Sequence, residues 1–338
     1  MSKNKKRVDI GGQAVIEGVM MKSPDAMGIA VRKPNGDMVI SHEKIESLSK
    51  KYPWTAWPFI RGIVNFALMM ILGMNVLQKA TNMLGVLDEE PSKFEIWLSK
   101  KLGKSVEKVV MAVAIILAIL LSILIFFMIP ESFAMLLRKA TNNRIIIDLG
   151  SGLIRILILI LYMVLVSFVP DVKRTFMYHG AEHKTVYCHE NNLPLTVENV
   201  KKFSRLHPRC GTSFILIVFI VSILLFTVVG YHGNVYYLRL LSRLALMPFI
   251  AGISYELLKG LAHNDSNFIR FLRWPGLKLQ LLTTKEPTDD MLECAIVAMN
   301  VALYGEPESI KNEDGYSVIK DYRQADPILK DLVDNENI

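Results

Sequence analysis

The sequence predicts an α-helical membrane protein with four spans, one interfacial or re-entrant helix and a small cytoplasmic α+β lobe. Long apolar runs recur along the chain, basic residues gather in one of the loops between them, and both flanks carry patterns of a small folded domain. The 338 residues are 51% hydrophobic and only 21% charged, with a mean hydropathy of +0.32. A soluble domain of this length does not need uninterrupted apolar runs of about 20 residues.

Four apolar runs are long enough to cross about 30 Å of hydrocarbon at 1.5 Å per residue. The second run can begin as early as Ile145, and the fourth is weaker because it contains Pro248 and Glu256. Buried core helices of a large soluble protein are the alternative, but runs this apolar rarely recur in soluble folds. The runs comprise residues 109–129, 153–169, 212–229 and 244–261.

Lys and Arg in short loops indicate the orientation of the spans, because such loops stay on the cytoplasmic side. The segment 171–211 is richer in Lys and Arg than the links on the other side, 138–144 and 239–243. This segment is therefore predicted to be cytoplasmic, and counting spans outward places both termini there too. The basic N-terminus is not followed by the apolar stretch of a secretory signal.

The segment 59–84 is apolar but interrupted by polar residues, among them Arg61, Asn65 and Lys79. If it crossed the bilayer, either the basic N-terminus or the lysines of 93–108 would lie outside, against the positive-inside rule. We expect an amphipathic helix that lies in the inner interface or dips into it. A fifth span is the alternative.

The parts outside the runs indicate a lobe made from both ends of the chain. The Asn35-Gly36 pair is a strong hairpin signal. Thr288 is expected to cap a late helix, and residues 277–283 resemble a strand that would add to the N-terminal strands. The predicted division is a β-meander at 1–57, an interfacial helix and basic linker at 58–108, a four-helix membrane domain at 109–262 with its cytoplasmic loop at 171–211, a strand and helix at 263–304, and a loose tail at 305–338.

One motif carries recognisable chemistry: residues 179–183 read His-Gly-Ala-Glu-His. On a helix, His179 and His183 lie four residues apart on one face, where both imidazoles can reach one ion. Glu182 could act as a general base for a water activated by that ion, as in inverted zincin peptidases. The same loop contains His207 and Cys210, whose side chains are ordinary zinc ligands.

We therefore expect a divalent ion, most plausibly Zn²⁺, held by His179 and His183 with His207 or Cys210 completing the shell, and with Glu182 outside it. Cys188, His189 and His263 are further ligand-capable side chains, too many for one site. A bend at Pro170 is needed to bring the two halves of the loop together. The alternatives are interfacial histidines bonded to carbonyls or lipid phosphates, and a redox role for the cysteines, for which no disulfide is expected in the cytosol.

Two ionisable residues fall inside the apolar runs, where such groups are functional candidates by default. If its run begins at Leu153, Arg155 lies near the outer end of the span and extends its guanidinium to the interface. Glu256 lies near the inner end of the fourth run, and the sequence leaves its role open.

Several segments together resemble the YqhQ-like family of bacterial polytopic membrane proteins, a domain of unknown function sometimes described as predicted metal-dependent enzymes. The resemblance implies a bacterial cytoplasmic membrane and a family-wide role for the histidine loop, but no demonstrated reaction. It covers nearly the whole chain up to about Tyr304 and is carried by GGQAVIEGVMM, HGAEHK, HPRCGTSF, SYELLK and LQLLTTKEP.

Three functions remain open on this basis. A metal-dependent hydrolase would use Glu182 at the membrane interface, on a lipid-linked molecule or a membrane-protein segment. A non-catalytic assembly or regulatory factor would dock a membrane-protein partner and hold a structural metal or none. A transporter is disfavoured because the four spans offer few polar groups to line a path. The lipid bilayer is the expected partner in each case, and no nucleic acid is expected.

Overall fold

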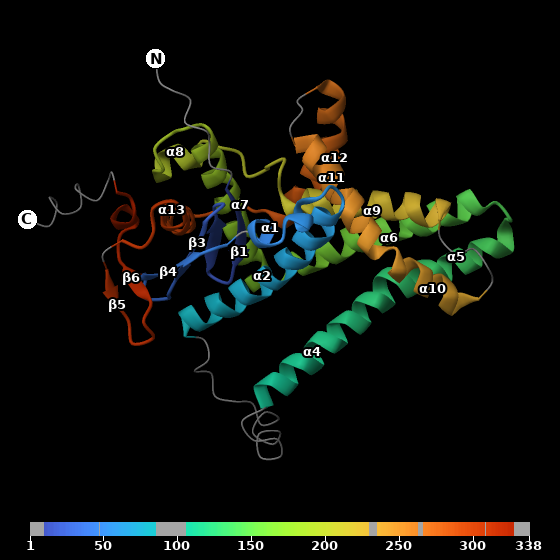
Figure 1. The fold of residues 1–338 in the computed structure, drawn as a ribbon, viewed down its shortest axis with the longest axis horizontal. Coiled ribbons are helices and arrows are strands. Elements are labelled where there is room, and N and C mark those ends of the chain that lie inside the picture. Colours follow the sequence, from blue (N-terminus) through green and yellow to red (C-terminus); the bar gives the residue numbers. More distant parts are fainter. Residues whose placement is uncertain are drawn as a thin grey trace, which may run out of the picture.

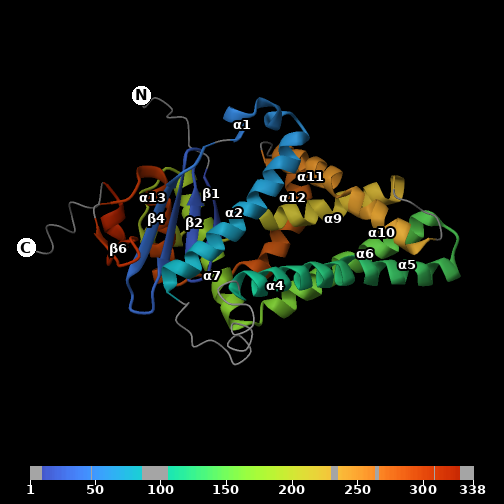
Figure 2. The same ribbon diagram turned by 60° about the horizontal axis from the view of Figure 1, so that its bottom comes forward.

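The computed structural model describes residues 10–46, 48–85, 106–229, 235–262, 266–307 and 309–327. A sheet with its covering helices forms a lobe at one end, and a bundle of long helices extends away from it (Figure 1; Figure 2). His263 and most of the lysine-rich segment 93–108 lie outside the described residues, so the expectations for them are not addressed.

The lobe contains a six-stranded antiparallel sheet in the order β1-β2-β3-β4-β6-β5. The predicted hairpin at Asn35-Gly36 is confirmed: β3 pairs with β4, and Gly36 has a φ of +92° between them. Residues 11–22 form two paired strands rather than one long strand, because the chain reverses at Glu17, whose φ is +51°. The strands are β1 (Gly11–Val15), β2 (Gly18–Lys22), β3 (Ala26–Arg32), β4 (Met38–Lys44), β5 (Ile310–Lys311) and β6 (Ser317–Ile319).

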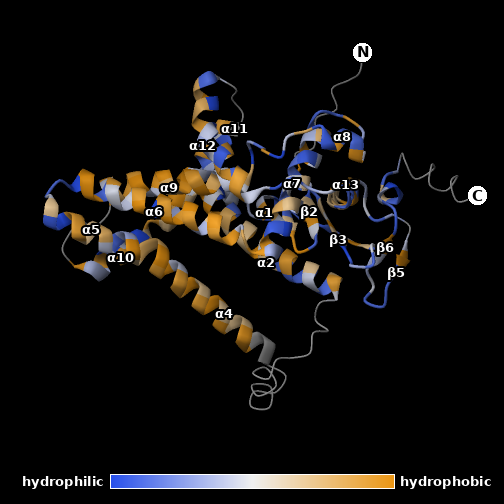
Figure 3. Cartoon of the chain, turned by 180° about the vertical axis from the view of Figure 1, so that it is seen from behind, coloured by the Kyte–Doolittle hydropathy of each residue, from blue (hydrophilic) through white to orange (hydrophobic). Residues whose placement is uncertain are grey.

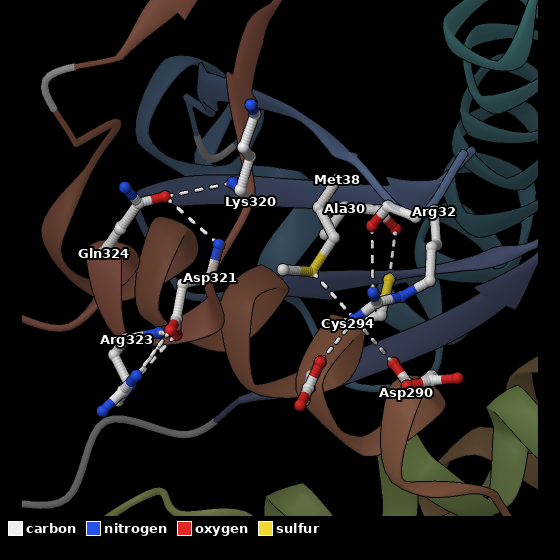
Figure 4. Close-up of polar contacts among 11 residues, drawn as sticks. Ala30, Arg32, Met38, Asp290, Cys294, Lys320, Asp321, Arg323 and Gln324 are labelled. Atoms are coloured by element: carbon white, nitrogen blue, oxygen red, sulfur yellow. Dashed lines mark hydrogen bonds and ion pairs between the residues drawn. The ribbon is translucent and has the colours of Figure 1, made fainter. Parts of the chain in front are cut away.

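The C-terminal segment joins this sheet, so the prediction of a loose tail from residue 305 is wrong for its described part. Strand β6 pairs with β4, with Met38 opposite Ile319. The 3₁₀ helix η5 (Tyr322–Ala325) follows, and its N-cap Asp321 forms a capping box with Gln324 (Figure 4). Strands β5 and β6 have only two and three residues. They are too short to show the polar–apolar alternation by which a strand is recognised in a sequence.

Helices cover both faces of the sheet. The predicted helix after Thr288 is confirmed as α13 (Asp289–Tyr304), which packs with α7 (Pro170–Glu190) and the short α8 (Val197–Lys201) against one face. Polar contacts fix α13 to β3: Arg32 lies 2.6 Å from Glu293, and the Cys294 thiol donates to the Ala30 carbonyl at 3.2 Å (Figure 4). The C-terminal turns of α2 (Ile60–Leu84) cover the other face.

The strand predicted at residues 277–283 is instead the end of helix α12 (Asn267–Thr283). The buried residues Gly276, Leu279, Gln280 and Thr283 follow one another at helical spacing of three, one and three residues. Gln280 is the source of the error, since a fully buried glutamine disguises the helical period as a polar–apolar alternation.

The bundle is the apolar part of the molecule, as its colouring by hydropathy shows (Figure 3). Within the described parts of the chain, four helices are long and apolar enough to cross a membrane: Ile60–Leu84, Val109–Ala140, Arg144–Val166 and Gly211–Val228. The fourth predicted run, residues 244–261, falls mostly in the second of two helices, Tyr236–Ala245 and Met247–Leu261, which are bent by 41° at a break just before Pro248. Taken as one span, this pair is a fifth candidate. The bundle comprises α4 (Val106–Ile123), the π-helical η4 (Leu124–Met128), α5 (Ile129–Ala140), α6 (Arg144–Val166), α9 (Gly211–Val228), α10 (Tyr236–Ala245) and α11 (Met247–Ala262).

Arg155 does not lie near the end of its helix, so the expectation that it reaches the interface is wrong. Helix α6 begins at Arg144, which places Arg155 near its middle. Its side chain is buried and donates to the Phe126 carbonyl at 3.0 Å. Glu256, whose role the sequence leaves open, forms a 2.5 Å ion pair with Arg61 of α2.

Helix α2 connects the two parts of the molecule. After the short α1 (Leu48–Lys51) and η1 (Pro53–Ala56), its first turns pack against α11, where a Cβ on Gly62 would meet Gly252 Cα at 2.9 Å. Its last turns bury Val76 and Ala80 against the sheet. The same helix therefore contacts both the apolar bundle and the polar lobe.

Candidate metal centre

Helix α7 carries the histidine motif and turns away from the bundle where it begins. Helix α6 ends at Val166, and Pro170 occupies the first turn of α7, where proline's fixed φ and missing N–H are tolerated. His179 and His183 lie one turn apart on α7, with ring centroids 4.4 Å from each other. The bend predicted at Pro170 is present.

Cys210 completes the cluster from the start of the next apolar helix. It is the N-cap of α9, and its Sγ accepts from the Thr212 N–H. The same sulfur lies 3.3 Å from Nε2 of His179. One potential ligand atom from each of His179, His183 and Cys210 lies within 4.8 Å of the other two.

Backbone carbonyls orient both imidazoles. Nδ1 of His179 lies 2.9 Å from the Thr283 carbonyl oxygen, and Nδ1 of His183 lies 2.6 Å from that of Arg205. A carbonyl can only accept, so each Nδ1 carries the proton and each Nε2 offers a lone pair. Metal-bound histidines use this arrangement to fix the tautomer and the direction of the coordinating nitrogen.

One of the two carbonyls, that of Thr283, comes from a segment that the sequence did not associate with the site. Thr283 ends α12, and its hydroxyl contacts that of Thr212 at 3.2 Å. The fully buried Gln280 holds the His207 backbone from both sides, accepting from its N–H at 2.9 Å and donating to its carbonyl at 2.7 Å. Gln280 and Thr283 belong to the LQLLTTKEP segment, which helps to carry the family resemblance and whose first part was predicted as a strand rather than as part of the site.

Gly180 allows the segment after α12 to cross α7 closely. A Cβ at this position would lie 2.1 Å from the Lys285 carbonyl oxygen. The Lys285 N–H donates to the Phe176 carbonyl at 2.8 Å, and the Lys184 ammonium pairs with Glu286 at 2.5 Å. The glycine of the HGAEHK segment is therefore a packing requirement of the centre.

His207, predicted as a possible ligand, is not brought into the cluster. Its Nδ1 accepts from the Arg209 N–H at 3.3 Å and its Nε2 faces Glu190 at 3.4 Å. Its ring lies 5.7 Å from that of His183. Cys188 is also separate: burial raises the pKa of its thiol to about 11, and its Sγ faces the Pro194 carbonyl.

The Glu182 side chain packs against the first strand, β1. It is 7% exposed, and a Cβ on Gly12 would lie 2.9 Å from its Cγ. Burial raises the pKa of its carboxyl, while His179 and the backbone of Gly12 act in the opposite direction. Glu182 thus lies within electrostatic range of His179 but outside the group of three ligand atoms.

The three side chains suit a zinc-type ion. Two imidazoles and one thiolate form a set seen in zinc enzymes, where three protein ligands leave a fourth position open. Burial lowers the pKa of His183, which favours the neutral form that coordinates metal. Cys210 offers its sulfur from the N-cap of α9.

Taken together, these features define a largely helical protein with apolar helices long enough to span a membrane, a small antiparallel sheet and a buried His/Cys cluster. The chain belongs to the family described as protein of unknown function (DUF1385), which it matches over residues 57–304. It is 36% identical over 320 residues to the uncharacterized protein YqhQ of Bacillus subtilis (strain 168), covering 93% of this chain and 98% of that protein. No solved structure matches it.

Proposed function

We propose that the chain is a multi-pass protein of the bacterial cytoplasmic membrane that works as a metal-dependent hydrolase at the cytoplasmic interface. The observation that carries this proposal is the cluster of His179, His183 and Cys210, with both histidines oriented by carbonyls so that each Nε2 carries a lone pair. Three such ligands leave one position for a water or a substrate.

A divalent ion in this cluster would act as a Lewis acid and make water a usable nucleophile near neutral pH. The chain's own contribution would be to hold the ligands in place and to supply the Glu182 carboxylate as the acceptor of the proton. Glu182 lies next to His183 in the chain and within electrostatic range of His179. A movement of β1, which covers Glu182, would open the carboxylate to the site.

The location of the cluster indicates the class of substrate. Cys210 immediately precedes the apolar helix α9, so the metal would lie at the boundary between the bundle and the polar lobe. A site at this boundary would lie close to molecules that are themselves held in the membrane. We infer that the substrate is a lipid-linked molecule or a segment of a membrane protein.

Elemental analysis of the detergent-solubilised protein tests the metal. Wild type and Cys188→Ser should each carry one divalent ion, whereas His183→Ala and Cys210→Ser should carry none. The Cys188 variant is a matched control, since it alters a buried cysteine of α7 that lies outside the cluster. Absence of metal from wild type purified without chelator, after incubation with Zn²⁺, would refute the proposal.

A second function, a non-catalytic assembly or regulatory factor with a structural metal, is favoured by one observation. Glu182 is covered by β1 and held by the Gly12 backbone, a position suited to a structural role. Complementation with Glu182→Gln and His183→Ala separates the two. A hydrolase loses function in both variants, because glutamine cannot accept the proton. An assembly factor keeps function in Glu182→Gln and loses it in His183→Ala.

A further inference from the structure

A second cluster of buried charged groups lies in the bundle, among helices that extend away from the sheet (Figure 1; Figure 2). Glu131 of α5 pairs with two arginines of α10: Arg239 lies 2.9 Å from one carboxylate oxygen, and Arg243 contacts the other. Arg155 of α6 lies beside them, and the Phe226 ring is 5.2 Å from its guanidinium and 5.4 Å from that of Arg243. All four charged residues are at most 6% exposed.

The charges in this cluster do not balance. Three guanidinium groups face one carboxylate, and arginine does not release its proton in proteins. The next charged neighbours, Arg138 and Asp148, add one charge of each sign and leave the surplus unchanged. An uncompensated charge is unfavourable in a low-dielectric interior, so a surplus of this kind favours the binding of an anion.

Arg155 has the donor that such an anion would need. Its Nε donates to the Phe126 carbonyl, but its buried Nη2 has no hydrogen-bond partner among the described residues. Phe126 belongs to η4, a π-helical turn inside the otherwise α-helical segment from α4 to α5. Such turns interrupt the normal hydrogen-bond ladder and occur often at functional sites. The backbone of η4 thus positions Arg155 while leaving one edge of its guanidinium unpaired.

We propose that Arg155, Arg239 and Arg243 form a binding site for a phosphate-type oxyanion inside the bundle, separate from the His/Cys cluster. A planar guanidinium matches the geometry of two phosphate oxygens, and a phosphate supplies the negative charge that Glu131 alone does not. The oxyanion comes from either of two sources, the headgroup of an anionic phospholipid or free inorganic phosphate. Both offer the same chemistry to the arginines.

Ligand-dependent thermal stability of the full chain in dodecyl maltoside, a detergent without phosphate, tests this site. Phosphatidylglycerol is compared with diacylglycerol of the same acyl chains, and inorganic phosphate with chloride at equal ionic strength. A ligand that binds only the folded state raises the unfolding temperature. A rise with phosphatidylglycerol alone identifies a lipid site, and a rise with inorganic phosphate identifies a site for free anion. No rise with either refutes the proposal.

Two charge variants distinguish binding from a purely structural role. Arg155→Gln should weaken binding of the active probe by about tenfold or more, since it removes a charged hydrogen bond. Glu131→Gln enlarges the positive surplus and should tighten binding several-fold. A structural role predicts lower stability in both variants with no opposite change in affinity. Arg144→Gln, an exposed arginine at the start of the same helix, is the control and should bind like wild type.

If Arg155→Gln does not fold, a comparison of wild type with Glu131→Gln still tests the proposed anion site. Binding to wild type that is unchanged or weaker in Glu131→Gln contradicts the proposed charge balance. Unchanged binding in a folded Arg155→Gln protein does so as well. Neither result bears on the His/Cys cluster, whose metal content is measured independently.

Discussion

His179 and His183 depend on residues that are distant in the sequence for their chemical form. The Thr283 and Arg205 carbonyls determine which nitrogen of each ring is free, and Gln280 holds the loop that presents Cys210. A metal bound here would thus draw its affinity from α7, the loop before α9 and the end of α12 together. Substitutions outside the ligands should therefore reduce metal affinity, as is common for groups that orient metal ligands.

Substitution of Gly180 tests whether a residue that is not a ligand affects metal binding. Gly180→Ala should lower the free energy of unfolding by about 2–3 kcal/mol and reduce metal content, because the added Cβ would collide with the Lys285 carbonyl. Gly211→Ala is the matched control: a Cβ there meets nothing within 4 Å. Chemical denaturation and elemental analysis of both variants measure the difference. Equal behaviour of the two would show that α7 and the segment after α12 are not closely packed.

At the scale of elements, the sequence predicted the structures whose signals are local. The Asn35-Gly36 hairpin, the helix after Thr288 and the bend at Pro170 each depend on residues close to one another in the chain. The centre could be predicted in part, since the spacing of His179 and His183 carries the information. The sequence could not predict that Cys210, rather than His207, lies beside the two histidines, because this depends on how the loop folds against Glu190 and Gln280.

The errors at this scale have a common cause, which is tertiary packing that overrides a local pattern. The 277–283 segment is helical because Gln280 is buried against the His207 backbone rather than exposed. Strand β6 exists because β4 offers an edge to pair with. The error at Arg155 is the exception, because its cause is local: α6 begins at Arg144, after the N-cap Asn143, whose side chain accepts from the N–H of Ile145.

Helix α2 is the element whose relation to the membrane matters most for the topology. Its length and apolarity suffice for a span, yet Val76, Ala80 and Met83 are buried against the sheet. The remaining residues 60–75 reach roughly 24 Å, less than the roughly 30 Å of a hydrocarbon core. We therefore retain the prediction that α2 lies in the interface.

An alkaline phosphatase fusion after Gly85 tests this prediction. The enzyme is active only outside the cytoplasm, so the fusion should be inactive, whereas a fusion after Asn142, in the link between α5 and α6, should be active. High activity of the Gly85 fusion would mean that α2 crosses. Equal activity of the two fusions would contradict the order of spans proposed for the bundle.

At the scale of the whole molecule, the sheet constrains the number of crossings. Strand β4 near the N-terminus pairs with β6 near the C-terminus, so both lie on one side of any membrane. Helix α7, which falls between α6 and α9, packs on the same lobe. An even number of crossings must therefore separate β4 from α7, and again α7 from β6. Crossings by α4–α5 and α6, then by α9 and α10–α11, satisfy this, whereas an added crossing by α2 does not.

Labelling of introduced cysteines determines on which side the lobe lies. The native cysteines are unsuitable reporters because Cys188, Cys210 and Cys294 are all buried, and burial raises the pKa of Cys294 to about 12. Their burial instead gives a low background for substitutions at two exposed positions, Glu198→Cys on α8 of the lobe and Asn142→Cys in the link between α5 and α6.

The Lys and Arg of 171–211 predict a cytoplasmic lobe. In intact cells, a membrane-impermeant maleimide should therefore label Asn142→Cys, and should label Glu198→Cys only after permeabilisation. The reverse pattern would place the lobe outside and overturn the orientation while leaving the count of spans intact. Labelling of both sites in intact cells would contradict the membrane arrangement itself, since α6 would then not separate two compartments.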